Sequence, residues 1–134
     1  MAKDKILVQF DFDENYGTVV DLICFNLGID SGKYFKTFKD ANAYLMIINK
    51  SKDFPDIAII AGYLGRGSTD GEELAKKFRE ISPKTKIIAY TADDEAKWGD
   101  YLAIKSSDGQ ENSLIGILAK LTGKEFNFDN SKTK

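Results

Sequence analysis

Short apolar runs alternate with amphipathic segments along the chain. Five runs are too short for independent helices and are predicted to be strands: residues 5–10, 33–38, 56–60, 86–90 and 101–104. Between them, and after the last, apolar residues recur three or four positions apart, which predicts helices with one buried face. This alternation indicates a doubly wound parallel sheet with helices on both faces.

Capping and turn residues predict where these helices begin and end. The first helix ends at Gly28, and Asp40 caps a second helix that runs to about residue 49. Thr69 and Glu72 have the spacing of a capping box at the start of the third helix. The last helix ends at Gly123.

The segment between Thr91 and Tyr101 is too short for a helix of ordinary length with its two connections. The sequence therefore predicts a single helical turn or no helix between the fourth and fifth strands. Trp98 is expected to be exposed there.

Length and charge exclude several classes of protein. The 134 residues predict one domain over residues 1–123 and a polar tail over 124–134, whose Phe126 and Phe128 are expected to contact the body. The net charge of −2 argues against a nucleic-acid partner. No run approaches the roughly 20 apolar residues of a membrane span, so we expect a cytoplasmic protein without a membrane partner. The chain has no histidine, which excludes Ser-His and Cys-His dyads.

In a doubly wound sheet, chemistry lies at the carboxyl ends of the strands. Those ends carry Asp11 after the first strand, Ala61 after the third, Thr91 after the fourth and Lys105 after the fifth. One carboxylate and one lysine cancel in charge. Magnesium usually needs one or two carboxylates together with phosphate oxygens, so this set predicts no metal and no cofactor.

The most specific stretches are PDIAII at 55–60, FREISPKTKIIAYTA at 78–92 and YLAIK at 101–105. With them the chain, from about residue 5 to 123, resembles the CheY-like receiver domains of bacterial two-component response regulators. The resemblance implies a flavodoxin-like fold with strand order 2-1-3-4-5. It also implies a phosphorylated aspartate after the third strand, a magnesium-holding acidic pair after the first, a Ser/Thr after the fourth and a lysine after the fifth.

Carried over position by position, the acidic pair becomes Phe10 and Asp11, and the phosphate acceptor becomes Ala61. Thr91 and Lys105 keep the hydroxyl and the lysine. Two of the three carboxylates are missing. We therefore expect a degenerate pseudo-receiver without enzymatic activity, in which Phe10 fills space beside Ala61 and Asp11 pairs with Lys105.

The resulting hypothesis is a stand-alone module that acts by protein–protein contact without phosphorylation, in two-component-type signalling. Its candidate partner surface is Trp98, Tyr101 and Leu102, and a homodimer stays open. The alternative is an atypical switch that responds to a small ligand or to phosphorylation at a non-standard residue.

Two other motifs have simpler interpretations. The loop GYLGRGSTDG at 62–71 has the glycine spacing of a nucleotide phosphate loop but lacks its lysine, and receivers carry a glycine-containing loop at this place. The acidic residues Asp11, Asp13 and Glu14 suggest a metal site, but a solvated helix start explains the last two.

Overall fold

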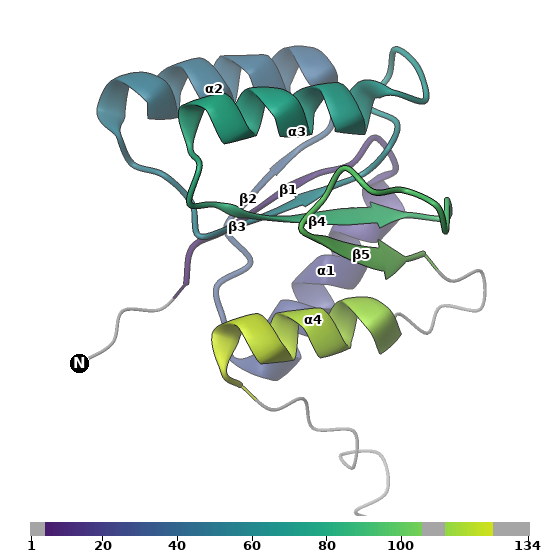
Figure 1. Cartoon of the computed structure of the whole chain (residues 1–134). Helices are drawn as coiled ribbons and strands as arrows, with labels where there is room; N and C mark the ends of the chain where they lie inside the picture. Colours follow the sequence, from purple (N-terminus) through teal and green to yellow (C-terminus); the bar gives the residue numbers. More distant parts are fainter. Residues whose placement is uncertain (1–4, 106–111, 125–134) are drawn as a thin grey trace, which may run out of the picture.

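The computed structural model describes residues 5–105 and 112–124, and its centre is one five-stranded sheet (Figure 1). All neighbouring strands pair in parallel, in the order β2-β1-β3-β4-β5. The strands are β1 (Leu7–Phe10), β2 (Lys33–Phe35), β3 (Ile57–Ile60), β4 (Lys86–Thr91) and β5 (Tyr101–Ile104). The predicted fold class and strand order are confirmed.

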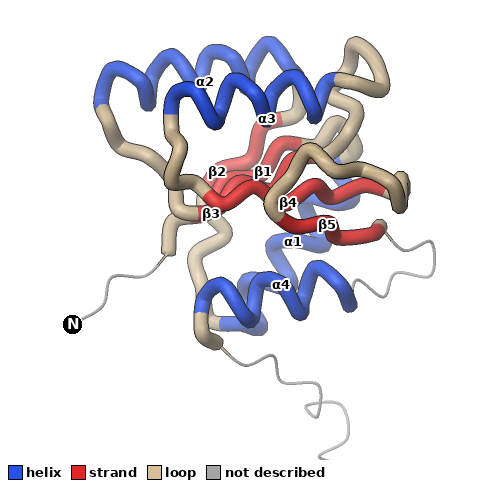
Figure 2. Tube along the Cα trace, in the orientation of Figure 1, coloured by secondary structure: helices blue, strands red, loops and turns tan. Residues whose placement is uncertain are grey.

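Helices cover both faces of the sheet (Figure 2). They are α1 (Glu14–Leu27), α2 (Phe38–Ser51), α3 (Asp70–Ile81) and α4 (Asn112–Thr122). Side chains alternate across each strand, so Leu7 joins the cluster under α1 and α4 while Val8 joins the cluster under α2 and α3. Two hydrophobic cores therefore hold the sheet and fix the ends of its strands.

The ends of α1 and α2 follow local capping chemistry. Gly28 ends α1 in the left-handed conformation, with φ of 73°, as predicted. The prediction that Asp40 caps α2 is wrong: Thr37 is the cap, and its hydroxyl accepts from the backbone amide of Asp40 at 3.1 Å. Phe38 is buried in the core as the first residue of α2, so that strand β2 ends and the helix is capped three residues earlier than predicted.

The predicted capping box of α3 does not form. Thr69 is the N-cap, but its side chain makes no capping hydrogen bond. Asp70, one residue later, has its carboxylate turned back to the preceding loop, where it accepts from the amide of Gly67 at 3.0 Å. The spacing therefore located the start of the helix correctly but not its hydrogen bonds.

No helix lies between β4 and β5 within the described residues, as predicted; residues 92–100 form a loop. Asp100 connects the end of this loop to β4 by two hydrogen bonds. Its Oδ2 accepts from the amide of Ile87 at 2.8 Å, and its amide donates to the Ile87 carbonyl at 2.8 Å. The expected exposure of Trp98 is wrong. Its ring is half-buried against the α2/α3 core, and a Cβ on Gly71 would lie 2.8 Å from it.

No helix in the described part of the chain is long and apolar enough to cross a membrane. The predicted tail residues Phe126 and Phe128 lie outside the described residues, so the domain boundary at residue 123 stays a prediction.

Candidate functional site

A cavity of about 820 Å³ lies at the carboxyl edge of the sheet. Four of the five predicted site residues line it: Asp11, Ala61, Thr91 and Lys105. They come from the ends of four different strands, and the parallel order of the sheet brings these ends together.

Phe10, the fifth predicted residue, does not line the cavity. Its buried side chain belongs to the α2/α3 core, where its ring stacks on Phe35 at 5.6 Å and meets Phe78 edge-on at 5.7 Å between centroids. Only its backbone reaches Ala61, whose amide donates to the Phe10 carbonyl at 2.8 Å. Phe10 faces the core because side chains alternate across the strand, and Asp11 then faces the cavity.

Asp11 forms the predicted ion pair with Lys105, at 2.8 Å between Oδ2 and Nζ. Its other oxygen, Oδ1, accepts from the amide of Asp13 at 3.0 Å. Burial raises the pKa of Asp11 above its usual value, although the Lys105 charge acts in the opposite direction. The Oδ1 atom of this carboxylate is thus hydrogen-bonded, whereas the buried Oδ2 atom has the Lys105 ammonium as its ion-pair partner and no hydrogen bond.

The backbone of Asp11 is held as firmly as its side chain. Its amide donates to the Phe35 carbonyl at 3.1 Å, and its carbonyl accepts from the hydroxyl of Tyr34. The Tyr34 ring packs against Gly17 of α1, where an added Cβ would approach it to 3.2 Å. Burial, with smaller effects from nearby carboxylates, raises the pKa of Tyr34 to about 12.

Two tyrosines that the sequence did not single out surround Lys105. Its Nζ lies 4.1 Å from the ring centroid of Tyr16 and 5.3 Å from that of Tyr90. The two rings pack edge-on at 5.4 Å. In the sequence, Tyr16 belongs to the apolar pattern of α1 and Tyr90 to that of β4, so nothing in the local pattern distinguishes them from core residues.

Ala61 and Thr91 offer little chemistry to the cavity. The buried Ala61 contributes a methyl group. Thr91 Oγ1 accepts from the amide of Asp93 at 3.2 Å and so helps to form the turn after β4.

The loop over residues 62–69 is organised by one buried carboxylate, Asp70, which the sequence did not reveal. Its Oδ2 accepts from the amides of Leu64 at 2.9 Å, Arg66 at 2.9 Å and Gly67 at 3.0 Å. Its Oδ1 accepts from Arg66 Nε at 3.2 Å. Burial acts to raise the pKa of Asp70, but the backbone donors and the guanidinium outweigh it, so the pKa lies below its usual value.

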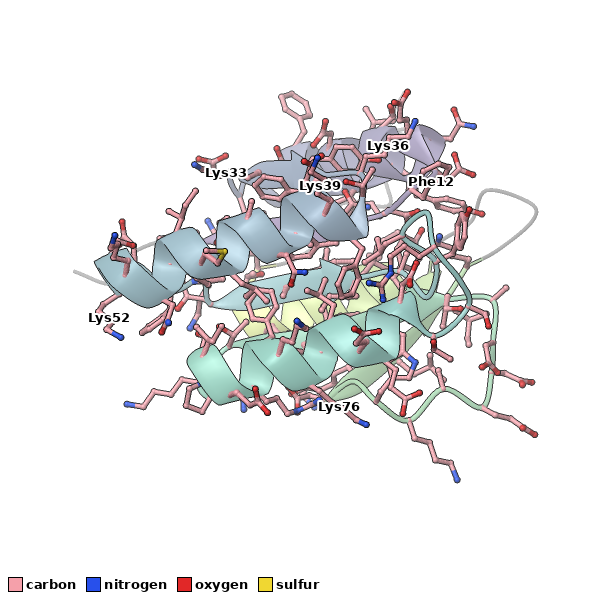
Figure 3. All side chains as sticks on the ribbon, turned by 90° about the horizontal axis from the view of Figure 1, so that it is seen from above. Phe12, Lys33, Lys36, Lys39, Lys52 and Lys76 are labelled. Atoms are coloured by element: carbon pink, nitrogen blue, oxygen red, sulfur yellow. The ribbon has the colours of Figure 1, made fainter. Side chains whose placement is uncertain are left out.

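The mouth of the cavity is aromatic and charged. Phe12 and Tyr63 pack edge-on at 5.1 Å, and Lys36 lies 4.9 Å from the centre of the Phe12 ring. Figure 3 shows Phe12 and Lys36 near each other at this end of the molecule. Lys36 also pairs with Glu14 at 2.9 Å, whereas Asp13 and Asp93, which line the cavity too, leave its rim with an excess of negative charge.

The residues present do not fit the magnesium that receivers use. Among the described residues, no group of three or more His, Cys, Asp or Glu side chains could hold a metal ion. Asp11 already binds Lys105 and the Asp13 amide, and a methyl and a core phenyl occupy the other two carboxylate positions. No step through a metal is therefore derived for this site.

The three predicted partner-surface residues do not share one face. Trp98 packs on the α2/α3 core, whereas Tyr101 packs on the α1/α4 core. Leu102 follows Tyr101 in the strand and so points away from it. Their role in partner binding stays a prediction.

Comparison with known proteins identifies the fold of the chain. No family model and no curated protein matches the sequence. Solved structures do match, among them the signal receiver domain of an HD domain-containing protein from Pseudomonas fluorescens Pf-5, with 15% identity, a TM-score of 0.69 and coverage of 92% of this chain and 90% of that chain. The chain has a receiver-domain fold.

Two further structures support the same fold. The Francisella response regulator 1452 receiver domain is 20% identical, with a TM-score of 0.67 and coverage of 90% of this chain and 98% of that one. The Erythrobacter litoralis PhyR response regulator REC domain is 17% identical, with a TM-score of 0.68 and coverage of 98% and 96%. At such identities the likeness concerns the receiver fold alone, and function depends on the site.

Proposed function

We propose that this chain is a pseudo-receiver, a phosphorylation-independent interaction module in two-component-type signalling. The observation that carries the proposal is Ala61, a buried methyl group where the receiver fold places its phosphate acceptor. An acyl phosphate cannot form on alanine. The engaged Asp11 supports the proposal, because it is the single carboxylate at the three acidic receiver positions and already pairs with Lys105.

The direct test adds magnesium with acetyl phosphate, and separately with beryllofluoride, to the whole chain. We expect no mass increase of one phosphate and no change in the amide chemical shifts of Asp11, Ala61, Thr91 and Lys105. A phosphate on any residue of the cavity would contradict the proposal.

A gain-of-function variant tests the same proposal from the other side. Ala61→Asp supplies an acceptor but leaves Asp11 paired with Lys105, so we expect it to remain unphosphorylated. Ala61→Asn is the matched control for size and polarity. Restoring the other missing acid by Phe10→Asp would place a carboxylate in the α2/α3 core, where an unpaired charge is strongly destabilising. Phosphorylation of the single variant Ala61→Asp would show that the pocket can still bind magnesium.

A second candidate is a switch that responds to a small ligand. It is favoured by the cavity of about 820 Å³, which has the size of small-molecule sites and is lined in part by Phe12, Tyr63 and Trp98. A thermal-shift screen of small molecules, read against the Trp98→Phe variant, tests it. A ligand that stabilises the wild type and changes Trp98 fluorescence would support it, and the absence of any such ligand would favour the interaction module alone.

A further inference from the structure

Helix α1 carries an exposed apolar surface flanked by acids, here called the acidic α1 surface. It consists of Asp21, Leu22 and Phe25 of the helix and of Ile29 and Asp30 just after its end, which together with Ser31 line a hollow of about 480 Å³. Ile29 is itself buried. Leu22 is 64% exposed and Phe25 is 85% exposed. The helix has no lysine or arginine. Lys124, whose Nζ donates to the Gly28 carbonyl at 3.2 Å, offsets part of the negative charge at the end of the helix.

Helix α2 carries a second exposed apolar surface with the opposite charge, here called the basic α2 surface. It consists of Lys39, Ala43, Met46, Ile47 and Lys50, all of them exposed. Met46 is 73% exposed and Ile47 is 64% exposed. Lys39 and Lys50 lie seven residues before and four residues after Met46, so both share its side of the helix.

The surroundings of α2 strengthen its positive charge. Lys52 caps the end of the helix, and Asp40 is the helix's single carboxylate. Figure 3 shows Lys39 and Lys52 near opposite ends of α2. Large apolar side chains that gather on one exposed surface mark an interaction site. The apolar side chains of α1 are flanked by acidic residues and those of α2 by lysines, so the two surfaces have complementary charges.

We propose that the basic α2 surface of one copy binds the acidic α1 surface of a second copy of this chain. Met46 and Ile47 occupy the hollow beside Leu22 and Phe25, which removes all four side chains from water. Lys39 and Lys50 meet Asp21 and Asp30 at the edge of the contact, where opposite charges fix orientation and speed association.

The fold determines the geometry of this contact. Helix α1 covers one face of the sheet and α2 the other, as Figure 1 shows, so the two surfaces of one chain point apart. One chain cannot bring them together. Copies therefore join head to tail, which is a heterologous contact that forms a ring or an open row.

The contact does not depend on the proposed signalling function, because neither surface contains a residue that lines the large cavity. Copies joined in this way keep the carboxyl edge of the sheet open.

Analytical ultracentrifugation of the whole chain gives the first test. At about 1 mM chain and low salt we expect an average mass above the 15.0 kDa of one copy. Raising the salt from about 0.01 M to about 1 M shortens the Debye length from about 30 Å to about 3 Å and should weaken the association. A chain that stays monomeric throughout would overturn the proposal.

Charge exchange gives the decisive test. The variant Lys39→Glu/Lys50→Glu makes both surfaces acidic, and Asp21→Lys/Asp30→Lys makes both basic. We expect the dissociation constant of each variant alone to rise by more than about tenfold, because like charges then meet. An equal mixture of the two restores attraction and should associate again.

The matched control is Lys76→Glu/Lys97→Glu, which changes the net charge equally at exposed residues outside both surfaces. It should associate like the wild type. Circular dichroism checks that every variant is folded. Association that survives both surface variants, or a mixture that stays monomeric, would show that the copies do not meet through α1 and α2.

Discussion

Asp11 and Asp70 each have 2% of their surface exposed, yet their surroundings move their pKa values in opposite directions. Burial raises the pKa of Asp11 despite the Lys105 charge beside it. The pKa of Asp70 is lowered, because three backbone amides and the Arg66 guanidinium outweigh its burial. The pKa of a carboxylate thus depends both on how deeply it is removed from water, which prevails at Asp11, and on the donors around it, which together prevail at the shallower Asp70.

The two carboxylates also organise different parts of the site. Asp11 joins β1 to Lys105, the residue after β5, across the width of the cavity. Asp70 holds only residues 64–67, a few positions before it in the chain. Asp11 therefore connects strand ends across the carboxyl edge of the sheet, whereas Asp70 stabilises a single loop.

The largest effect should come from Lys105→Met, which leaves the Asp11 charge buried without its partner. We expect the free energy of unfolding to fall by about 3 to 5 kcal/mol at neutral pH, measured by urea denaturation. The double variant Asp11→Asn/Lys105→Met removes both charges and should recover much of this loss. Equal stability of the single and double variants would show that the pair is not electrostatically coupled.

Asp70→Asn should have the next largest effect, about 1 to 3 kcal/mol, because the amide group cannot accept from all the donors that the carboxylate satisfies. The amides of Leu64, Arg66 and Gly67 should exchange their hydrogens faster, which NMR measures residue by residue. Glu73→Gln is the control, since Glu73 also contacts Arg66 but is exposed and should matter little. If hydrogen exchange at the three amides did not change, Asp70 would not be the residue that orders this loop.

The pH dependence of stability sharpens the comparison. The pKa of Asp11 is raised in the folded state. Its contribution to the free energy of unfolding is therefore present below pH 3.8, the pKa in the unfolded chain, and is lost as the pH rises through the folded pKa. Asp70 has a lowered pKa, so its contribution is present above 3.8 and is lost as the pH falls through the folded value. Each proton changes the free energy of unfolding by at most about 1.4 kcal/mol per pH unit.

Urea unfolding at a series of pH values separates the two contributions. Asp11→Asn should remove the decline above pH 3.8, and Asp70→Asn should remove a decline below it. If both variants changed the stability on the same side of pH 3.8, the pKa values of Asp11 and Asp70 would not be shifted in opposite directions.

The smallest effect should come from Tyr34→Phe, which removes only the hydroxyl that donates to the Asp11 carbonyl. We expect a loss of about 1 kcal/mol in thermal or urea unfolding. Tyr63→Phe, at the exposed mouth of the cavity, is the matched control and should be neutral. A neutral Tyr34→Phe would mean that the backbone of Asp11 needs no support from β2.

Periodicity was enough to predict the strands, their parallel arrangement and the missing helix, whereas the strand order 2-1-3-4-5 followed only from the resemblance to receiver domains. The order of strand ends then placed Asp11, Ala61, Thr91 and Lys105 correctly at one edge. The Asp11–Lys105 pair was predicted as well, but the aromatic contacts between distant segments were not. Phe10 belongs to the core because of Phe35 and Phe78, and Lys105 lies among Tyr16 and Tyr90 because α1 and β4 meet there.

The local errors have a similar cause. Asp40 had the right residue type for a cap, but α2 starts at the buried Phe38 and is capped by Thr37. Thr69 does stand at the N-cap of α3 as predicted, but its side chain makes no capping hydrogen bond. Capping motifs identify that a helix begins nearby, whereas burial of a neighbouring residue decides where.

The Asp11–Lys105 pair joins strands that are neither neighbours in the sheet nor close along the chain. Because β3 and β4 lie between the two strands, we expect the pair to form late in folding. A contact absent from the transition state leaves the folding rate almost untouched and slows unfolding. Lys105→Met should then raise the unfolding rate much more than it lowers the folding rate, so that the pair mainly lengthens the lifetime of the native state.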